Sequence, residues 1–355
     1  MASIEPFLKF AAAKGASDLY FTAAAPLMVR IEGETIPVRG EGQEAFSVAE
    51  IEQLAFSIMN EAQRAEFDAN WEVDFAIWRE GSGRFRVNVF RQRNSVSMVL
   101  RHVREIPKFE NLGLPPVLGE LIMEKRGLIL MVGATGSGKS TTLAAMLNLR
   151  NQKLSGHILT IEDPIEFYHR NLKSIVNQRE VGSDTRSYHA ALRSAVREAP
   201  DVILVGESRD RDTMEACIQL AGTGHLAVST LHANNAYQAM QRIVNLFPEE
   251  FREQLFMDLA MNLRAIVSQR LVPGKDGKRC AAVEVLINTP YVAELIRKGA
   301  IDQVKEAMED SSQPGMQTFD ESLIELVQAG RVDLEEALNN ADSRANLETK
   351  LSFGG

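Results

Sequence analysis

The sequence predicts an α/β protein in which a doubly wound domain with a parallel sheet follows a smaller α+β domain. Three observations support this prediction. The 355 residues exceed the roughly 250 to 300 at which a single hydrophobic core stops growing, so two domains are expected. A glycine-rich segment follows the first apolar strand of the second half. Helical patterns separate four such apolar strands there, as in parallel sheets covered on both faces: 128–132, 157–161, 202–205 and 226–230.

The first domain is predicted over 1–104. Ser47 and Glu50 have the spacing of a capping box, which marks the start of a helix. Near the end of the domain, apolar residues alternate with polar ones, as they do in half-buried strands. The expected elements are helices over 4–14 and from Val48, and strands over 18–21, 28–31, 84–89 and 95–100.

A linker is predicted over 105–117, because three prolines and a glycine interrupt every regular period there: Pro107, Gly113, Pro115 and Pro116. The second domain is then predicted over 118–355. Within it, 251–272 has apolar residues at helical spacing, and the chain ends in an acidic, mostly helical region.

Composition narrows the function classes. The net charge of −9 argues against a broad nucleic-acid surface, which needs a basic face. The N-terminus lacks the pattern of a signal peptide, and the longest apolar run is far shorter than the roughly 20 residues that span a bilayer. Cys217 and Cys280 lack the spacing of a zinc site and are predicted to be buried thiols. A cytoplasmic protein without membrane insertion is expected.

The glycine-rich segment has the form G-x-x-x-x-G-K-[ST] between an apolar strand and a helix. This context predicts a P-loop, in which backbone N–H groups and a helix N-terminus bind phosphate. Lys139 is predicted to contact the outer phosphates of ATP and Ser140 to bind Mg²⁺. The predicted nucleotide-binding residues are Gly133, Ala134, Thr135, Gly136, Ser137, Gly138, Lys139, Ser140 and Thr141.

Acidic residues follow two of the other apolar strands. Glu207 comes after 202–205, where a metal-binding or catalytic carboxylate is expected in a P-loop ATPase. Glu162, Asp163 and Glu166 follow 157–161, and each could bind Mg²⁺ or act as the base. A solvated loop residue is the alternative for any one of these four acids.

Two histidines and a group of arginines are further candidates. His225 and His232 lie on either side of the strand that begins at Leu226, and His232 is predicted to sense the γ-phosphate or donate to the attacking water. For each histidine the alternative is a structural hydrogen bond. Arginines near the end of the first domain could form a solvated face or reach a neighbouring subunit's nucleotide: Arg84, Arg86, Arg101 and Arg104.

Taken together, these motifs resemble the secretion ATPases of type II and type IV pilus systems. The resemblance is strongest for the type IV pilus retraction ATPases, the PilT and PilU family, and covers nearly the whole chain. Besides the P-loop, it rests on 161–167 (IEDPIEF), 176–181 (VNQREV), 191–195 (ALRSA), 200–207 (PDVILVGE), 222–232 (GTGHLAVSTLH), 15–19 (GASDL) and 315–320 (GMQTFD).

The resemblance implies a RecA-like ATPase domain behind a PAS-like N-terminal domain, assembled into a homo-hexamer. It implies an Asp box at Glu162, Asp163 and Glu166, with Glu166 and Glu207 catalytic, and a His box at His225 and His232. It also implies ATP and Mg²⁺ as cofactors, an inner-membrane pilus platform protein as partner, and a location at the cytoplasmic face of the inner membrane.

One departure from the retraction motors concerns 291–298, YVAELIRK, which resembles their Ala-Ile-Arg-Asn-Leu-Ile-Arg-Glu motif but has Ala293 in place of the first arginine. This makes the chain more similar to the PilU branch and implies an accessory role beside a companion retraction ATPase. A pilus-assembly or type II secretion ATPase is one alternative, although two cysteines cannot build the four-cysteine zinc module of that group. A nucleotide-binding ring subunit with little turnover and a nucleic-acid translocase are the others.

Overall fold

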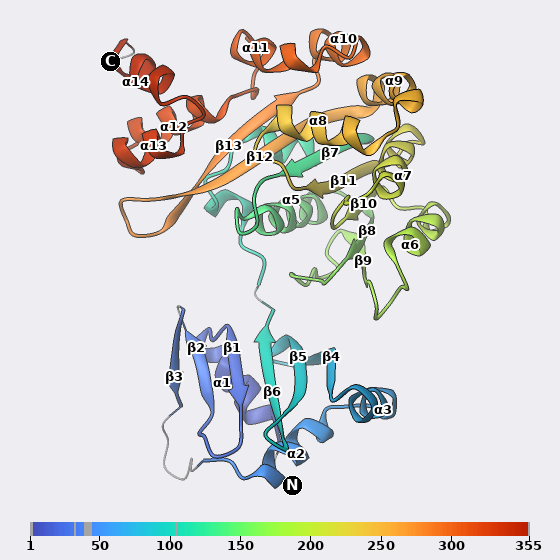
Figure 1. Cartoon of the computed structure of the whole chain (residues 1–355), viewed down its shortest axis with the longest axis vertical. Helices are drawn as coiled ribbons and strands as arrows, with labels where there is room; N and C mark the ends of the chain where they lie inside the picture. Colours follow the sequence, from blue (N-terminus) through green and yellow to red (C-terminus); the bar gives the residue numbers. More distant parts are fainter. Residues whose placement is uncertain (1–2, 32, 39–44, 104, 354–355) are drawn as a thin grey trace. The chain divides into compact units, whose positions relative to one another are not determined.

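The computed structural model describes residues 3–31, 33–38, 45–103 and 105–353. They form two compact units: the first contains the residues up to Glu105 together with Glu166–Tyr168, and the second contains the rest of the chain. Each unit has its own buried apolar core. Figure 1 labels the elements of both units.

The first unit is an antiparallel sheet of six strands in the order β3-β2-β1-β6-β5-β4. Its largest fully buried side chains include Leu8, Phe21, Phe67 and Phe85. The elements are α1 (Glu5–Lys14), β1 (Asp18–Phe21), β2 (Met28–Ile31), β3 (Glu34–Pro37), α2 (Val48–Ser57), α3 (Glu61–Asn70), β4 (Glu72–Arg79), β5 (Gly83–Gln92) and β6 (Ser95–His102).

Most of the predicted elements of this unit are present. The capping box at α2 is confirmed, because the side chain of Ser47 accepts from N of Glu50 and the carboxylate of Glu50 accepts from N of Ser47. Three elements were not predicted: β3, α3 and β4. The signal for β4 was present, since Val73, Phe75 and Ile77 are buried and alternate with residues that are exposed or partly exposed.

The second unit contains a seven-stranded sheet in the order β13-β12-β7-β11-β10-β8-β9. All neighbours pair in parallel except β12 and β13, which pair antiparallel, so the predicted parallel sheet has one antiparallel edge strand. The strands are β7 (Gly127–Val132), β8 (Gly156–Glu162), β9 (Ser174–Glu180), β10 (Val202–Val205), β11 (Leu226–Leu231), β12 (Leu263–Pro273) and β13 (Arg279–Ile287).

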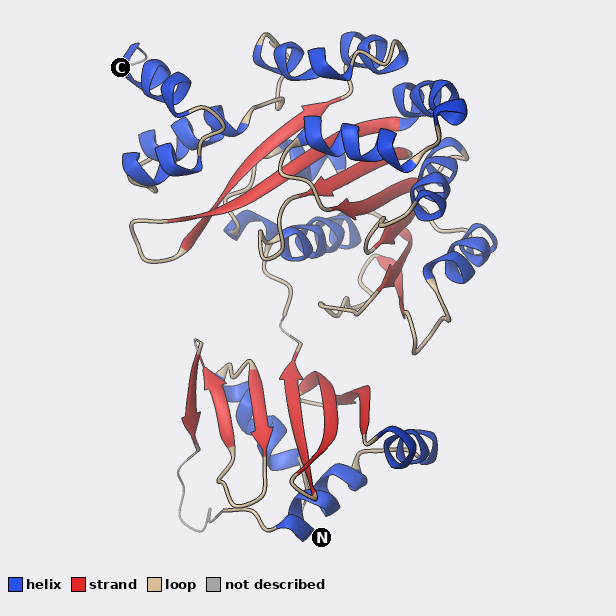
Figure 2. Ribbon diagram, viewed as in Figure 1, coloured by secondary structure: helices blue, strands red, loops and turns tan. Residues whose placement is uncertain are grey.

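Helices cover both faces of this sheet, as Figures 1 and 2 show. The longer ones are α5 (Lys139–Lys153), α6 (Tyr188–Ala195), α7 (Arg211–Gly222), α8 (Ala236–Leu246), α9 (Arg252–Asn262), α10 (Pro290–Arg297), α12 (Phe319–Gln328) and α14 (Arg344–Phe353). The shorter ones are η1 (Phe109–Asn111), α4 (Val117–Leu121), η2 (Val196–Glu198), η3 (Glu249–Phe251), η4 (Ile301–Gln303), α11 (Val304–Glu309) and α13 (Leu334–Asn340).

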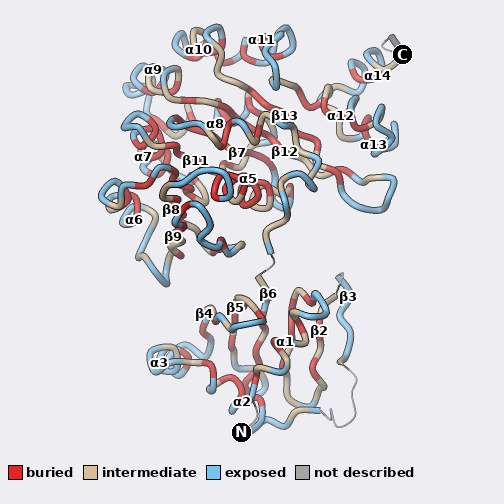
Figure 3. Tube along the Cα trace, turned by 180° about the vertical axis from the view of Figure 1, so that it is seen from behind, coloured by how far each residue is buried: buried red, intermediate tan, exposed pale blue. Residues whose placement is uncertain are grey.

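The side chains of β7 divide between two cores. Leu128, Leu130 and Val132 pack in a cluster with α6 to α11, whereas Ile129 and Met131 pack in a second cluster with α4 and α5. All six residues of β7 are buried (Figure 3). This two-sided burial explains why the strand is apolar throughout, as the sequence predicted.

The prediction of helical spacing over 251–272 is wrong beyond residue 262. Helix α9 ends at Asn262, and β12 follows directly from Leu263. Residues 265–269 of β12 are all buried, so its apolar run has no period of two that would separate it from a helix.

The C-terminal helices pack on the β12–β13 hairpin. Val272 and Cys280 of the hairpin share a buried cluster with residues of α12, α13 and α14. Arg270 connects the same parts, because its guanidinium lies 3.9 Å from the centre of the Phe319 ring and 2.6 Å from the carboxylate of Asp342. The mostly helical end of the chain is therefore confirmed.

Part of the segment predicted as a linker packs on the second unit. A Cβ at Gly113 would lie 2.6 Å from the Arg331 guanidinium, and Phe109 contacts a buried cluster of the sheet. Cys217 and Cys280 are free and buried, which confirms the prediction for both thiols. No helix within the described ranges has the length and apolar character needed to cross a membrane.

Candidate active site

The glycine-rich loop joins β7 to α5. β7 ends at Val132, and α5 begins at Lys139. Gly138, the N-cap residue of α5, has a φ of 87°, which favours glycine. A Cβ there would also lie 2.7 Å from Nε2 of Gln269. The loop therefore leads into the N-terminus of a 15-residue helix, whose free N–H groups favour phosphate.

The ammonium group of Lys139 lies within the loop. Its Nζ donates hydrogen bonds to the backbone oxygens of Gly133 at 2.7 Å and Ala134 at 2.9 Å. A phosphate would offer charged acceptors to the same ammonium, and hydrogen bonds between charged groups are the stronger kind. Lys139 is thus placed where it can exchange two carbonyls for a phosphate.

Two catalytic candidates meet at the edge of the sheet that carries this loop. Strands β7, β11 and β10 are parallel neighbours, so their carboxyl ends lie together. Glu207 follows β10, and its Oε1 lies 3.2 Å from Nε2 of His232, which follows β11. Its Oε2 lies 2.8 Å from Nε of Arg209. The Glu207 side chain is only 16% exposed, so the structure holds a mostly buried carboxylate between two side-chain nitrogens.

The other acids lie at and beyond the end of β8. Oε1 of Glu162 accepts hydrogen bonds from Oγ1 of Thr160 at 2.6 Å and from Nε2 of Gln178 at 3.2 Å. Asp163 and Glu166 are exposed in the loop that follows. Because β8 is the parallel neighbour of β10, Glu162, Asp163 and Glu207 share one edge of the sheet.

Tyr188, the first residue of α6, is part of this edge and was not predicted. A Cβ on Gly206 would lie 2.9 Å from its hydroxyl. Burial raises the pKa of the Tyr188 phenol above its ordinary value, and the nearby charges of Asp163 and Glu207 raise it further. The phenol therefore stays neutral beside the acids. Nothing in the local sequence distinguishes this tyrosine, since only the fold brings it there.

Arg209 is a second residue that the sequence analysis missed. It lies two positions after Glu207, and its hydrogen bond to that carboxylate raises the pKa of the guanidinium. The spacing Glu-x-Arg at the end of an apolar strand was visible in the sequence and could have indicated the pair.

His225 lies at the opposite edge of the sheet. It precedes β11, and its Nδ1 is 3.2 Å from both Oγ1 of Thr223 and the backbone oxygen of Leu220. Strand β11 separates it from His232. Within one chain the structure does not bring the two predicted histidines together.

Three of the four candidate arginines lie on β5 and β6. Arg86 and Arg101 are cross-strand neighbours, and Arg84 is the second residue of β5. Nε of Arg101 donates to the buried carboxylate of Asp18 at 2.8 Å, and this hydrogen bond raises the pKa of Arg101. Arg104 lies outside the described residues.

The oxygen ligands predicted for Mg²⁺ have suitable chemistry. In nucleotide sites Mg²⁺ uses one or two protein oxygens together with substrate phosphates and water. Ser140 supplies a hydroxyl in the first turn of α5, and Glu207 and Asp163 supply carboxylates at the same edge of the sheet. No group of three or more His, Cys, Asp or Glu side chains among the described residues could hold a metal ion by itself.

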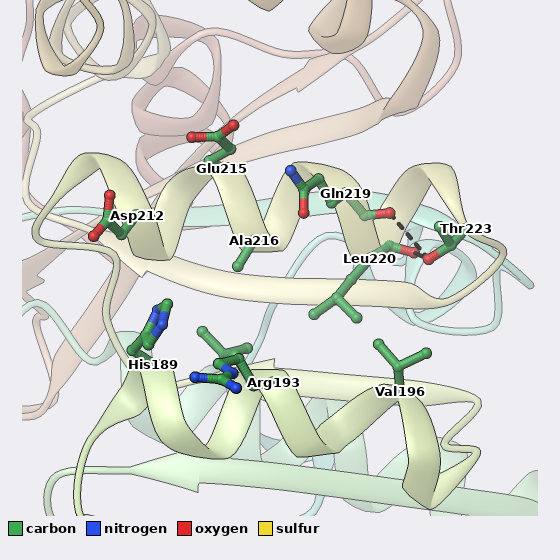
Figure 4. A pocket seen from close by; sticks show the side chains of 10 residues that line it. His189, Arg193, Val196, Asp212, Glu215, Ala216, Gln219, Leu220 and Thr223 are labelled. Atoms are coloured by element: carbon green, nitrogen blue, oxygen red, sulfur yellow. Dashed lines mark hydrogen bonds between the residues drawn. The ribbon is translucent and has the colours of Figure 1, made fainter.

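A separate groove of about 390 Å³ lies between α6 and α7. Its apolar lining includes Leu192, Val196 and Leu220, with Arg193 on α6 and Glu215 on α7 (Figure 4). None of the predicted nucleotide-binding or catalytic residues lines it. The groove is therefore no part of the proposed nucleotide site.

Comparison with known proteins agrees with this fold. The family described as "Type II/IV secretion system protein" matches residues 3–347. The chain is 48% identical to the type IV pilus ATPase PilU of Pseudomonas aeruginosa, over 99% of this chain and 91% of that protein. It is 42% identical to the PilT protein of the same organism, over 97% of this chain and 99% of that protein.

A solved structure shows the same architecture. The crystal structure of the pilus retraction motor PilT with bound ADP aligns with a TM-score of 0.90 at 44% identity, over 98% of this chain and 100% of that chain. This likeness confirms a RecA-like P-loop ATPase domain with a smaller PAS-like N-terminal α+β domain. The chain therefore belongs to the Type II/IV secretion system protein family, within which it resembles the type IV pilus ATPase PilU and the type IV pilus retraction ATPase PilT.

Proposed function

We propose that this chain hydrolyses ATP to ADP and phosphate with Mg²⁺, as a subunit of a homo-hexameric motor that assists type IV pilus retraction. The observation that carries the proposal is the contact of Glu207 with His232 at the sheet edge that bears the P-loop. The PilU and PilT relatives support the pilus assignment.

The chain's own groups have distinct tasks in this mechanism. Backbone N–H groups of the loop and α5 bind the phosphates, and Lys139 moves from the carbonyls of Gly133 and Ala134 to the outer phosphates. Ser140, with Glu207 or Asp163, would hold Mg²⁺, which when bound neutralises developing charge on the phosphates.

Carboxylates and a histidine complete the reaction site. Glu207 and Glu166 are the proposed catalytic acids, which orient the attacking water and accept its proton, with Glu162 beside them. His232 contacts Glu207. A hydrogen bond from His232 to the γ-phosphate would therefore also alter the position of the Glu207 carboxylate. His225 stays a prediction as the second member of the His box.

In a homo-hexameric ring, a neighbouring subunit would supply the arginines that complete each nucleotide site. Arg84, Arg86, Arg101 and Arg104 are proposed to contact the nucleotide of a neighbouring subunit, where a guanidinium stabilises charge on the phosphates. The proposed partners are an inner-membrane pilus platform protein and a companion retraction ATPase, at the cytoplasmic face of the inner membrane. No nucleic-acid partner is proposed.

The accessory role rests on the segment 291–298. Ala293 stands where the retraction motors carry an arginine, and identity to the PilU protein, 48%, exceeds identity to the PilT protein, 42%. The test measures pilus retraction in cells that contain this protein alone, the companion ATPase alone, or both. Full retraction with this protein alone would contradict the accessory role.

A nucleotide-binding ring subunit with little turnover is the second candidate. It is favoured by one observation, that both carboxylate oxygens of Glu207 are engaged, by His232 and Arg209. Turnover of ATP by the purified protein decides between the two. Binding of ADP without measurable hydrolysis, together with stimulated hydrolysis in mixed rings, would favour the second candidate.

A further inference from the structure

The nucleotide-binding loop has a polar contact from outside its own motif. Gln269 lies on β12, which is the parallel neighbour of β7, and only 2% of its surface is exposed. Its Nε2 donates to the backbone oxygen of Ser137 at 2.8 Å, and its Oε1 accepts from Oγ1 of Thr142 at 2.8 Å. Both ends of one buried amide are therefore bound to the P-loop and the first turn of α5.

This contact determines how one peptide group of the loop is oriented. In a trans peptide the C=O and the following N–H point to opposite sides. The C=O of Ser137 points at the buried amide of Gln269, so the N–H of Gly138 points away from β12. Gly138 is the N-cap of α5, where N–H groups have no acceptor inside the helix.

The fit around Gln269 is close. A Cβ on Gly138 would lie 2.7 Å from Nε2 of Gln269, and a Cβ on Gly133 would lie 2.5 Å from its backbone oxygen. Both ends of the loop thus lie against the same residue of β12. The two glycines are needed here for space as well as for backbone conformation.

We propose that Gln269 is a positioning residue of the nucleotide site. It holds the Ser137–Gly138 peptide so that the Gly138 N–H is available to phosphate. The inference rests on the proposed function, since it concerns the same nucleotide. Without the Nε2 donor, the buried C=O of Ser137 is left unpaired, and the peptide plane is free to rotate away from the orientation that binds phosphate.

The test compares substitutions with matched chemistry in the purified full-length chain. Gln269→Glu keeps the shape and the acceptor for Thr142 but replaces the donor facing Ser137 with an acceptor. Gln269→Met removes both polar contacts at similar volume. Thr142→Val removes only the second hydrogen bond. The control is Gln317→Glu, because Nε2 of Gln317 donates to the backbone oxygen of Val283 at 2.7 Å, away from the loop.

ADP affinity, the ATP KM and the Tm of the nucleotide-free protein are measured for each variant. We expect Gln269→Glu and Gln269→Met to weaken ADP binding about tenfold and to raise KM more than they lower kcat, because a ground-state phosphate contact is lost. Thr142→Val should change ADP affinity only about two- to threefold. Gln317→Glu should lower the Tm and leave ADP affinity unchanged.

Two results would overturn the proposal. One is ADP binding by both Gln269 variants at the wild-type level. The other is a loss of ADP affinity in Gln317→Glu equal to that in Gln269→Glu, which would indicate a general effect on stability. If Gln269→Glu does not fold, Gln269→Met decides. Failure of the wild-type chain to bind ADP would instead contradict the proposed function.

Discussion

Nε2 of His232 lies 3.2 Å from Oε1 of Glu207, across the carboxyl ends of two parallel strands. A second hydrogen bond joins the same two segments, since Oγ1 of Thr230 donates to the backbone oxygen of Gly206 at 2.6 Å. The segments that carry Glu207 and His232 are therefore joined by a side-chain contact and by a hydrogen bond to the backbone. A change at the histidine should reach the carboxylate directly.

Replacing Glu207 should separate nucleotide binding from turnover. In Glu207→Ala, ADP affinity should stay within a few-fold of wild type, because the loop is unchanged, while kcat falls about 100-fold or more. ADP titration and a phosphate-release assay measure the two quantities. Glu215→Ala is the control, since Glu215 pairs with Arg211 on α7 and should keep wild-type kcat. Equal kcat in both variants would remove Glu207 from the catalytic set.

Replacing Lys139 should remove hydrolysis. Lys139→Ala deletes the ammonium that is placed to contact the outer phosphates, so ATP turnover should fall below detection. Lys173→Ala is the matched control, because Nζ of Lys173 also donates to a backbone oxygen, that of Lys153. Undiminished ATPase activity of Lys139→Ala would contradict the P-loop assignment.

Ionisation of the buried Glu284 carboxyl should lower the free energy of unfolding as pH rises. Burial raises the pKa of this carboxyl to about 7 from 4.5, although it accepts from N of Ala236 and Oγ of Ser268. A raised folded-state pKa means that its stabilising contribution is complete below pH 4.5 and is lost as pH rises through 7.

The variant Glu284→Gln tests this dependence. Its amide oxygen can accept the same two hydrogen bonds without a charge, so the variant should match wild type at pH 5 and be more stable at pH 8 by up to about 3 kcal/mol. Denaturant unfolding at both pH values measures the difference. Glu325 is exposed, so Glu325→Gln should change the free energy of unfolding equally at the two pH values. If Glu325→Gln gave the same gain in stability at pH 8, Glu284 would not be the cause of the pH dependence.

An arginine that acts in a neighbouring subunit should show complementation. Arg86→Ala rings and Lys139→Ala rings should each be inactive, but mixed rings should regain ATPase activity. In a mixed ring, some sites combine an intact Lys139 with an intact Arg86 from the neighbour. Arg79→Ala, which removes an ion pair with Glu5, should stay active without mixing. Mixtures that remain inactive would exclude Arg86 as the residue acting in trans.

Site residues that directly follow a single apolar strand could be predicted from the local sequence pattern alone. The P-loop carries its whole pattern within eight residues, and Glu207 follows four buried apolar residues, so both were visible without any tertiary information. The apolar strands were equally clear, because two-sided burial leaves a continuous apolar run.

Contacts between distant segments could not be predicted in this way. Gln269 is 132 positions from Ser137, and Tyr188 reaches the acids only because α6 begins beside their edge of the sheet. β12 was interpreted as a continuation of α9, since its buried run has no period of its own. The misinterpreted strand was also the one that carries Gln269.

Strand β12 joins three parts of the second unit through three consecutive side chains. Ser268 binds Glu284, which accepts from the start of α8. Gln269 binds the loop. Arg270 binds the last residue of α13, Asn340, and Asp342 in the segment after it. Alternate residues of a strand face opposite sides, so a one-residue slip would reverse all three at once. The pairing register of β12 with β7 therefore links nucleotide binding to the C-terminal helices, and a single-residue deletion in β12 would disconnect them together.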